Sequence, residues 1–214
     1  MKINKKTLQL TQFAILLAIE MIVCFTPLGS IPIGPLVATL AAVPVIVTAI
    51  LLGTKAGTAM GFFTGLFSLV VWSTQLLPSP VSFVFTPIGQ FGNVHGNFWS
   101  LVICFVPRIL IGFVAGISYQ GFSRVFSKLK KGHIFAYNIS GILGSLTNTI
   151  LVLGGIYIFF GKEYAAANGK AYEDLLGILG IVVATNGVLE AIIGGIIAYA
   201  VCYPIQKYMK HHFA

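Results

Sequence analysis

The sequence is poor in charged residues, and acidic residues are fewer than basic ones. Of 214 residues, 13 are Lys or Arg and 5 are Asp or Glu, so 8 % carry a charge, while 57 % are hydrophobic. A soluble domain carries about 25 % charged residues, because its surface has to be solvated. So few charges exclude a soluble enzyme, a nucleic-acid-binding domain and a disordered chain. The sequence therefore predicts an integral membrane protein.

Cysteine is rare as well, and the motifs of enzymes are missing. Cys24, Cys104 and Cys202 lie far apart in apolar stretches, which predicts packing residues rather than a disulfide framework or a metal site. Gly161-Lys162-Glu163 lacks the earlier glycine and the hydroxyl residue of a phosphate-binding loop. We expect no catalytic residue, no metal and no cofactor, and so no enzyme.

Six apolar segments dominate what is present. Each approaches the roughly 20 residues that a membrane-spanning helix needs, and together they leave no room for a large soluble domain. We expect an all-α integral membrane protein, in which residues 1–214 form a single domain of six transmembrane helices. The segments are about Leu8–Phe25, Leu36–Leu52, Ala56–Leu77, Trp99–Phe122, Ile134–Phe160 and Leu175–Tyr203.

The basic residues predict the orientation of these helices. Ten of them fall in the N-terminus, the second–third loop, the fourth–fifth loop and the C-terminus, which alternate onto one side. Only Lys162 and Lys170 fall on the other side. Because Lys and Arg are enriched in cytoplasmic loops, we expect both termini in the cytoplasm of a multi-pass protein of the cell membrane. The net positive charge then needs no nucleic acid to explain it.

Two outward loops carry no charge at all and are rich in proline. They span residues 26–36 and 78–98, and proline lowers the entropy cost of ordering such loops. We interpret them as an extracellular lid over a binding site, and plain interfacial loops are the alternative. Candidate site residues in and just after the second loop are Gln90, Asn93, His95 and Trp99.

Three charged residues lie within the predicted spans: Glu20, Arg108 and Glu190. Each costs at least about 2.5–3.5 kcal/mol at the centre of a membrane helix, so each is expected to face protein or water. Arg108 either neutralises Glu190 or holds an anionic group of a ligand through two N–H donors. A ligand that shares Arg108 with Glu190 would satisfy both interpretations.

Neutral polar residues accompany these charges in the last two spans. Asn186, Glu190 and Gly194 share one helical face, and Asn148 belongs to a polar and small seam in the fifth span. Packing between helices explains the glycines of such seams. The convergence of Arg108 with Asn148, Asn186 and Glu190 in apolar surroundings is typical of a small-molecule pocket.

Small residues mark other helix faces as contact surfaces. The third span carries Gly57, Gly61 and Gly65 at intervals of four, a spacing that lets helices approach closely. In the first span, Ala14 and Ala18 point roughly 140° away from Glu20 at 100° per residue. We therefore expect Glu20 to face inward and the two alanines to form a smooth patch elsewhere.

With these motifs, the sequence resembles the substrate-binding S components of energy-coupling factor (ECF) vitamin transporters. The resemblance covers nearly the whole chain. The matching motifs are Ala14-Ile-Leu-Leu-Ala18, Pro44-Val-Ile-Val-Thr-Ala-Ile-Leu-Leu-Gly53-Thr-Lys-Ala-Gly57, Pro107-Arg108, Leu146-Thr-Asn-Thr149 and Asn186-Gly-Val-Leu-Glu190.

The resemblance implies a high-affinity vitamin binder without an ATPase of its own. Its partners would be a transmembrane coupling protein and two cytoplasmic ATPase subunits, and Ala14 and Ala18 would dock to the coupling protein. The site would lie in the outer half of the last three spans under the first and third loops. The S component would tip in the membrane to carry the site inward.

The motifs are most similar to those of the pantothenate-type branch. One carboxylate suits Arg108, and hydroxyl and amide groups suit Asn148, Asn186 and Glu190. Riboflavin is the alternative vitamin and would need aromatic stacking, for which Trp72, Trp99, Phe91 and Tyr119 are candidates, whereas folate would need a second cation. A membrane scaffold or an intramembrane enzyme is the competing class of protein.

Overall fold

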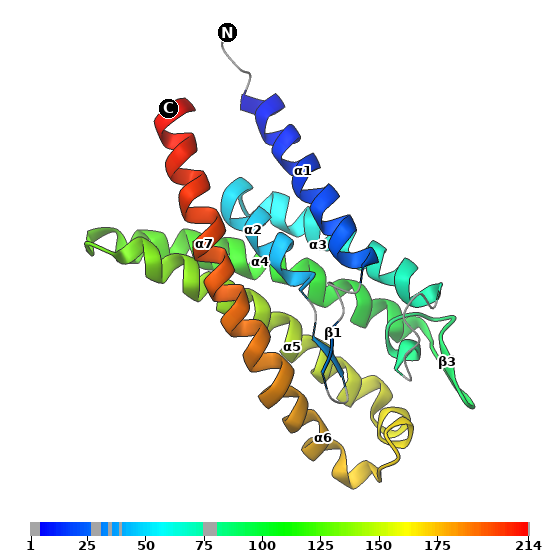
Figure 1. The fold of residues 1–214 in the computed structure, drawn as a ribbon. Helices are drawn as coiled ribbons and strands as arrows, with labels where there is room; N and C mark the ends of the chain where they lie inside the picture. Colours follow the sequence, from blue (N-terminus) through cyan, green and yellow to red (C-terminus); the bar gives the residue numbers. More distant parts are fainter. Residues whose placement is uncertain (1–4, 27–30, 34–35, 39, 75–80, 214) are drawn as a thin grey trace.

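The computed structural model describes residues 5–26, 31–33, 36–38, 40–74 and 81–213, which are mostly helical (Figure 1). The helices are α1 (Lys5–Phe25), α2 (Ala42–Leu52), α3 (Thr54–Ser73), α4 (Phe98–Val125), α5 (Gly132–Ala167), α6 (Leu175–Val182) and α7 (Val188–Phe213). A π-helical turn, η5 (Val183–Gly187), joins α6 to α7 without a break.

Five helical stretches in the described part of the chain are long and apolar enough to cross a membrane. They confirm the all-helical membrane class and five of the predicted spans. The stretches are Lys6–Phe25, Thr54–Ser73, Phe98–Lys128, Gly132–Ala167 and Tyr172–His211.

The second predicted span is shorter than expected. Its first residues, Leu36–Ala38, form strand β2, which pairs antiparallel with β1 (Ile31–Ile33). Pairing in a hairpin satisfies the backbone groups that a helix would otherwise satisfy, so α2 begins only at Ala42. At 11 residues, α2 is about 16 Å long, roughly half the thickness of a bilayer core. Residues 75–77, at the end of the third predicted span, lie outside the described residues.

The loop before α4 contains a second hairpin and a buried turn. A 3-10 turn, η2 (Ser82–Val84), precedes strands β3 (Gln90–Phe91) and β4 (Val94–His95). The side chain of Asn97 then accepts a hydrogen bond from the backbone N–H of Trp99 at 2.8 Å, and the hydroxyl of Ser100 accepts one from the backbone N–H of Asn97 at 3.1 Å. This reciprocal capping fixes the start of α4.

The helices pack in the sequence α3–α4–α5–α7, with α2 enclosed by them and α1 against α2 and α3 (Figure 1). Glycines allow the close approaches that the small-residue runs predicted. A side chain at Gly61 would meet the backbone carbonyl of Arg108, and one at Gly141 would meet the carbonyl of Gly194. These contacts fix α3 against α4, and α5 against α7. The three cysteines are buried, as expected of packing residues.

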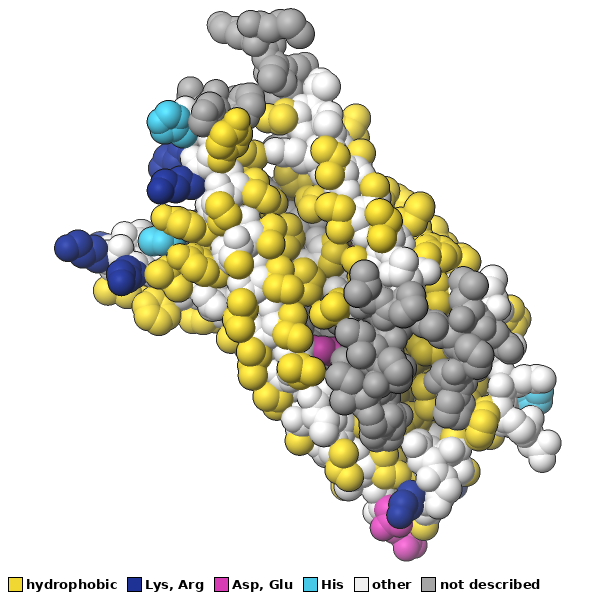
Figure 2. Space-filling model, viewed as in Figure 1, with side chains coloured by type: hydrophobic (Ala, Val, Ile, Leu, Met, Phe, Trp, Pro, Cys, Tyr) yellow, Lys and Arg dark blue, Asp and Glu magenta, His cyan; other side chains and the backbone are white. Residues whose placement is uncertain are grey.

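On the face drawn in Figure 2, most charged side chains lie toward the two ends of the molecule. The start of α1, the α4–α5 connection and the end of α7 lie toward one end, and the connection between α5 and α6 lies at the other (Figure 1). Lys128, Lys130, Lys131, Lys207 and Lys210 belong to the first end. The structure therefore gathers the basic segments that the sequence assigns to one side of the membrane.

Candidate functional site

Arg108 is buried in the middle of the bundle, directly after Pro107 in α4. Its side chain is 6 % exposed, and Nη1 donates a hydrogen bond to the carbonyl of Ile103 at 3.1 Å. Proline has no N–H, so Pro107 leaves the carbonyl four residues earlier, that of Ile103, without its helical donor. The Arg108 side chain replaces that donor. The Pro-Arg pair therefore keeps the helix satisfied and anchors the guanidinium.

A buried turn, residues 81–86, covers Arg108. The guanidinium carbon of Arg108 lies 5.2 Å from the centre of the Phe85 ring, within the range of a cation–π interaction. The hydroxyl of Ser100 donates to the carbonyl of Phe83 at 2.6 Å, which ties the turn to α4. The ring of Trp72 in α3 stacks on Phe85 at 5.1 Å between centroids. These contacts hold the Phe85 ring against the Arg108 guanidinium.

Arg108, Asn148, Asn186 and Glu190 meet around one cavity of about 40 Å³, which we name the α5–α7 cavity. The structure thus brings together, from α4, α5, η5 and α7, the four polar residues that the sequence predicts to converge. The other lining residues are Phe85, Thr149, Val152, Leu153, Val182 and Gly187.

The π-helical turn η5 shapes the wall of this cavity. It contains Asn186 and Gly187, and a side chain at Gly187 would meet Thr149 of α5. The hydroxyl of Thr149 donates to Oε2 of Glu190 at 3.4 Å. Strand β2 contacts η5 from outside, so the first hairpin lies beside the cavity (Figure 1). Single π-helical turns inside α-helices are frequent at functional sites.

Two polar atoms at the cavity are buried without a hydrogen-bond partner among the described residues. They are Oδ1 of Asn148, an acceptor, and Nδ2 of Asn186, a donor. A buried polar group without a partner costs about 1–3 kcal/mol. An acceptor and a donor next to a buried guanidinium are therefore complementary to an anionic ligand that also carries hydroxyl and amide groups.

A second cavity, of about 30 Å³, lies on the other side of Arg108 and is named the α1–α3 cavity. Arg108 and Asn148 line both cavities, and Cys24 and Thr64 line only this one. Glu20 lies behind Cys24 with no exposed surface, and its Oε1 accepts a hydrogen bond from Sγ of Cys24 at 3.2 Å. The inward orientation predicted for Glu20 is confirmed.

Comparison with known proteins agrees with this architecture. A family model described as "ECF transporter, substrate-specific component" matches residues 8–205. This chain belongs to that family. The substrate-specific component is 34 % identical to the pantothenic acid transporter PanT of Lactococcus lactis over 81 % of this chain and 80 % of the relative. It is 29 % identical to the pantothenate transporter PanT of Leuconostoc mesenteroides over 92 % of each chain.

Two solved structures share the fold of this substrate-specific component at 18 % sequence identity. ThiT from Listeria monocytogenes superposes with a TM-score of 0.59, covering 92 % of this chain and 97 % of ThiT. The S-component for biotin from an ECF-type ABC transporter gives a TM-score of 0.57 and covers 94 % of each chain. The family membership and the apolar helices make this chain a multi-pass membrane protein.

Four predicted site residues of the substrate-specific component lie away from both cavities. Gln90, Asn93 and His95 are exposed on the β3–β4 hairpin, which projects from the bundle (Figure 1). Trp99 is 44 % exposed and stacks on Phe159 at 4.0 Å. The buried part of the second loop reaches the cavity instead, through Phe85.

The aromatic residues considered for stacking a flavin do not converge in this component. Trp72 stacks on Phe85, and Tyr119 stacks on Tyr137 at 5.0 Å. Phe91 is 42 % exposed on the β3–β4 hairpin. Of the four rings, Trp72 lines the α1–α3 cavity, whereas Phe91, Trp99 and Tyr119 line neither cavity around Arg108, so the four do not form one stacking site.

The alanine face of α1 is open in the substrate-specific component. Ala14 and Ala18 are both exposed, while Glu20 on the same helix is buried. The predicted division of α1 into an inward glutamate and an outward alanine patch is confirmed.

Proposed function

We propose that this chain binds pantothenate as the vitamin-binding S component of an ECF-type ABC importer. The observation that carries the proposal is the buried Arg108, which lines two cavities with Asn148 and faces Asn186 and Glu190 across one of them. The names of both curated relatives support the choice of vitamin.

The chemistry of pantothenate fits these groups. Its single carboxylate binds the Arg108 guanidinium. Its hydroxyl and amide groups pair with the unpartnered Oδ1 of Asn148, the unpartnered Nδ2 of Asn186 and the carboxylate of Glu190. Arg108 is then shared between the ligand and Glu190, and its buried charge is compensated in the apolar interior.

Binding requires the two cavities to become one. At about 40 and 30 Å³, each has room for about one water molecule. Asn148 lines both cavities beside the anchored Arg108, so rotation of Asn148, with movement of Phe85, creates a single pocket around the guanidinium. The extracellular lid predicted over residues 26–36 and 78–98 of a single six-helix domain is part of this proposal, although residues 27–30, 34–35 and 78–80 lie outside the described residues. Of the described part, residues 81–86 contact the ligand.

The family resemblance extends the proposal to the complete importer. The S component has no ATPase of its own and works with a transmembrane coupling protein and two cytoplasmic ATPase subunits. The exposed Ala14 and Ala18 dock to the coupling protein, and both termini lie in the cytoplasm. The exposed alanine patch and the basic residues gathered at one end of the molecule support this arrangement.

The test is calorimetry on the full chain in detergent. We expect tight binding of pantothenate and weak binding of pantothenol, which has an alcohol in place of the carboxylate. Arg108→Gln should weaken pantothenate binding by about 2–5 kcal/mol, the usual cost of removing one partner of a buried charge pair. It should leave pantothenol almost unaffected, since that ligand has no carboxylate to lose.

Arg124→Gln is the matched control, because Arg124 is exposed near the end of the same helix. Unchanged pantothenate binding in Arg108→Gln would overturn the assignment of the carboxylate. A panel of riboflavin, thiamine, biotin and folate tests the substrate, and binding of one of these in place of pantothenate would overturn the choice of vitamin.

A further inference from the structure

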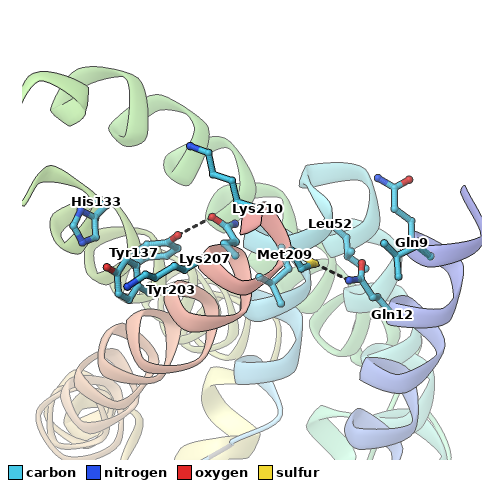
Figure 3. A pocket seen from close by; sticks show the side chains of 12 residues that line it. Gln9, Gln12, Leu52, His133, Tyr137, Tyr203, Lys207, Met209 and Lys210 are labelled. Atoms are coloured by element: carbon cyan, nitrogen blue, oxygen red, sulfur yellow. Dashed lines mark hydrogen bonds between the residues drawn. The ribbon is translucent and has the colours of Figure 1, made fainter. Parts of the chain in front are cut away.

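A larger cavity opens at the basic end of the molecule (Figure 3). Its volume is about 660 Å³, within the range of about 300–1,000 Å³ that is usual for small-molecule sites. It lies between the start of α1, the end of α2, the start of α5 and the last turns of α7. It shares no lining residue with the two cavities around Arg108.

The floor of this cavity is already fixed by hydrogen bonds. Oε1 of Gln206 accepts from the hydroxyls of Tyr119 and Tyr137 at 2.8 and 2.7 Å. Its Nε2 donates to the carbonyl of Ile50 at 3.0 Å. The amide thus joins α2, α4, α5 and α7, and its polar atoms are satisfied without a ligand. The four helices are therefore joined beside the cavity by the protein's own hydrogen bonds.

The charge around this cavity has one sign. Lys207 and Lys210 line it, and so does His133, whose ring stacks on Tyr203 at 4.8 Å. None of the five acidic residues of the chain lines it. A ligand that fits this charge pattern is an anion.

The walls are apolar, which distinguishes the cavity from a site for a small soluble anion. Leu8 of α1 and Leu51 and Leu52 of α2 face it. On the neighbouring surface, Leu10 of α1 is 70 % exposed and Ile205 of α7 is 38 % exposed, on helices that are apolar enough to cross a membrane. An amphiphile with an anionic head and an apolar chain matches both the basic side chains and the apolar walls of this cavity.

We propose that this cavity binds an anionic phospholipid from the surrounding membrane. The phosphate lies between Lys207 and Lys210, and the upper part of one acyl chain lies along Leu8, Leu51 and Leu52. Basic pockets between membrane helices are the recurring sites for such headgroups. This site is separate from the proposed vitamin site and does not depend on which vitamin binds there.

The test is native mass spectrometry of the full chain in non-ionic detergent, titrated with phosphatidylglycerol or phosphatidylcholine. We expect one phosphatidylglycerol to be retained in preference to phosphatidylcholine. Replacing both lysines, in Lys207→Gln/Lys210→Gln, should weaken that binding about 25-fold, because each lysine near an anionic lipid contributes about fivefold. Leu52→Trp should block the apolar part of the cavity and lower retention while both lysines remain.

The control is Lys128→Gln/Lys130→Gln, which removes the same charge from exposed positions outside the cavity. Equal losses in the two double variants would show diffuse attraction and overturn the site, as would equal retention of the two lipids. A third outcome, in which Leu52→Trp abolishes assembly with the coupling protein while lipid retention is unchanged, would assign the cavity to a partner helix instead. Calorimetry with pantothenate should be unaffected by these variants, so the two proposals are tested separately.

Discussion

Pro107 and Arg108 act as one unit. The proline removes a helical hydrogen bond in the middle of α4, and the arginine side chain supplies a replacement donor to the carbonyl of Ile103. A proline inside a helix costs about 3 kcal/mol relative to alanine. The expected gain from this arrangement is a guanidinium held in one orientation before the ligand arrives, which lowers the cost of binding.

Pro107→Ala tests this arrangement. The new N–H should bond to the Ile103 carbonyl and release Nη1 of Arg108. We expect higher thermal stability together with about tenfold weaker pantothenate binding, close to the loss of one hydrogen bond to a charged group. Thermal unfolding and calorimetry measure the two effects. Pro204→Ala in α7 is the control, since it lines none of the described cavities, and an equal loss of affinity there would contradict the role of Pro107.

At this scale the sequence predicts the polar half of the site but not its apolar half. Arg108, Asn148, Asn186 and Glu190 can be identified because polar residues are rare within the spans. Phe85 could not be identified, because nothing in the sequence distinguishes this one of 17 phenylalanines from a residue that only packs in the core. The apolar run around it, in a loop without charge, was the available signal. Whether Gln90 and the other polar loop residues point toward a cavity depends on the β3–β4 hairpin, which the sequence pattern does not predict.

At the scale of elements, the contact between α3 and α4 determines where Arg108 lies. Gly61 sits against the carbonyl of Arg108 itself, so the two helices meet at the residue that carries the proposed site. Any side chain at this position would force the helices apart. The small-residue run of α3 therefore contributes to the site as well as to packing.

Gly61→Ala should weaken pantothenate binding at least tenfold and lower the melting temperature, because the added methyl overpacks a close helix contact at a cost of about 1–3 kcal/mol. Gly154→Ala in α5 is the matched control, since a side chain there meets nothing within 4 Å. Replacing a helical glycine at such an open position is neutral or stabilises slightly. If Gly61→Ala bound pantothenate as tightly as this control, the contact between α3 and α4 would have no role in positioning the site.

The elements that the sequence missed are those that depend on tertiary contact. Composition and length suffice for α1, α3, α4 and α5. The β1–β2 hairpin replaces the start of a predicted span because Leu36–Ala38 pairs with a neighbouring strand. A helical period of 3.6 residues does not predict the π-turn η5. Asn186 and Glu190 nevertheless both line the α5–α7 cavity.

At the scale of the molecule, α1 is the helix least enclosed by the others. Only 11 % of its apolar window is buried, against 33–50 % for the other long helices. Its exposed alanine face is therefore available to a second protein, while Glu20 on the same helix is buried.

Ala14→Trp should leave pantothenate binding unchanged and abolish uptake by the complete importer, because the indole prevents close helix contact. Ile19→Trp is the comparison, since Ile19 is exposed on a different face of the same helix. Radiolabelled uptake and calorimetry on the isolated chain measure the two steps. If both variants lost uptake equally, the alanine face would have no specific role.

The distribution of basic residues predicts the orientation of the chain. Because the native cysteines are buried, single cysteines introduced at exposed positions can report it. A membrane-impermeant maleimide added to intact cells should label Lys162→Cys and spare Lys210→Cys until the cells are opened. The reverse pattern would place both termini outside.

The two small cavities around Arg108 also bear on the speed of binding. In the proposed function, a pocket that exists only after Asn148 and Phe85 have moved admits the vitamin only during openings, so the association rate falls below the usual 10⁵–10⁷ M⁻¹s⁻¹ by about the fraction of time spent open. The same closure traps the ligand once it is inside. Under the proposed function, high affinity then comes from slow release, and a vitamin that is released slowly leaves time for a slower transport step.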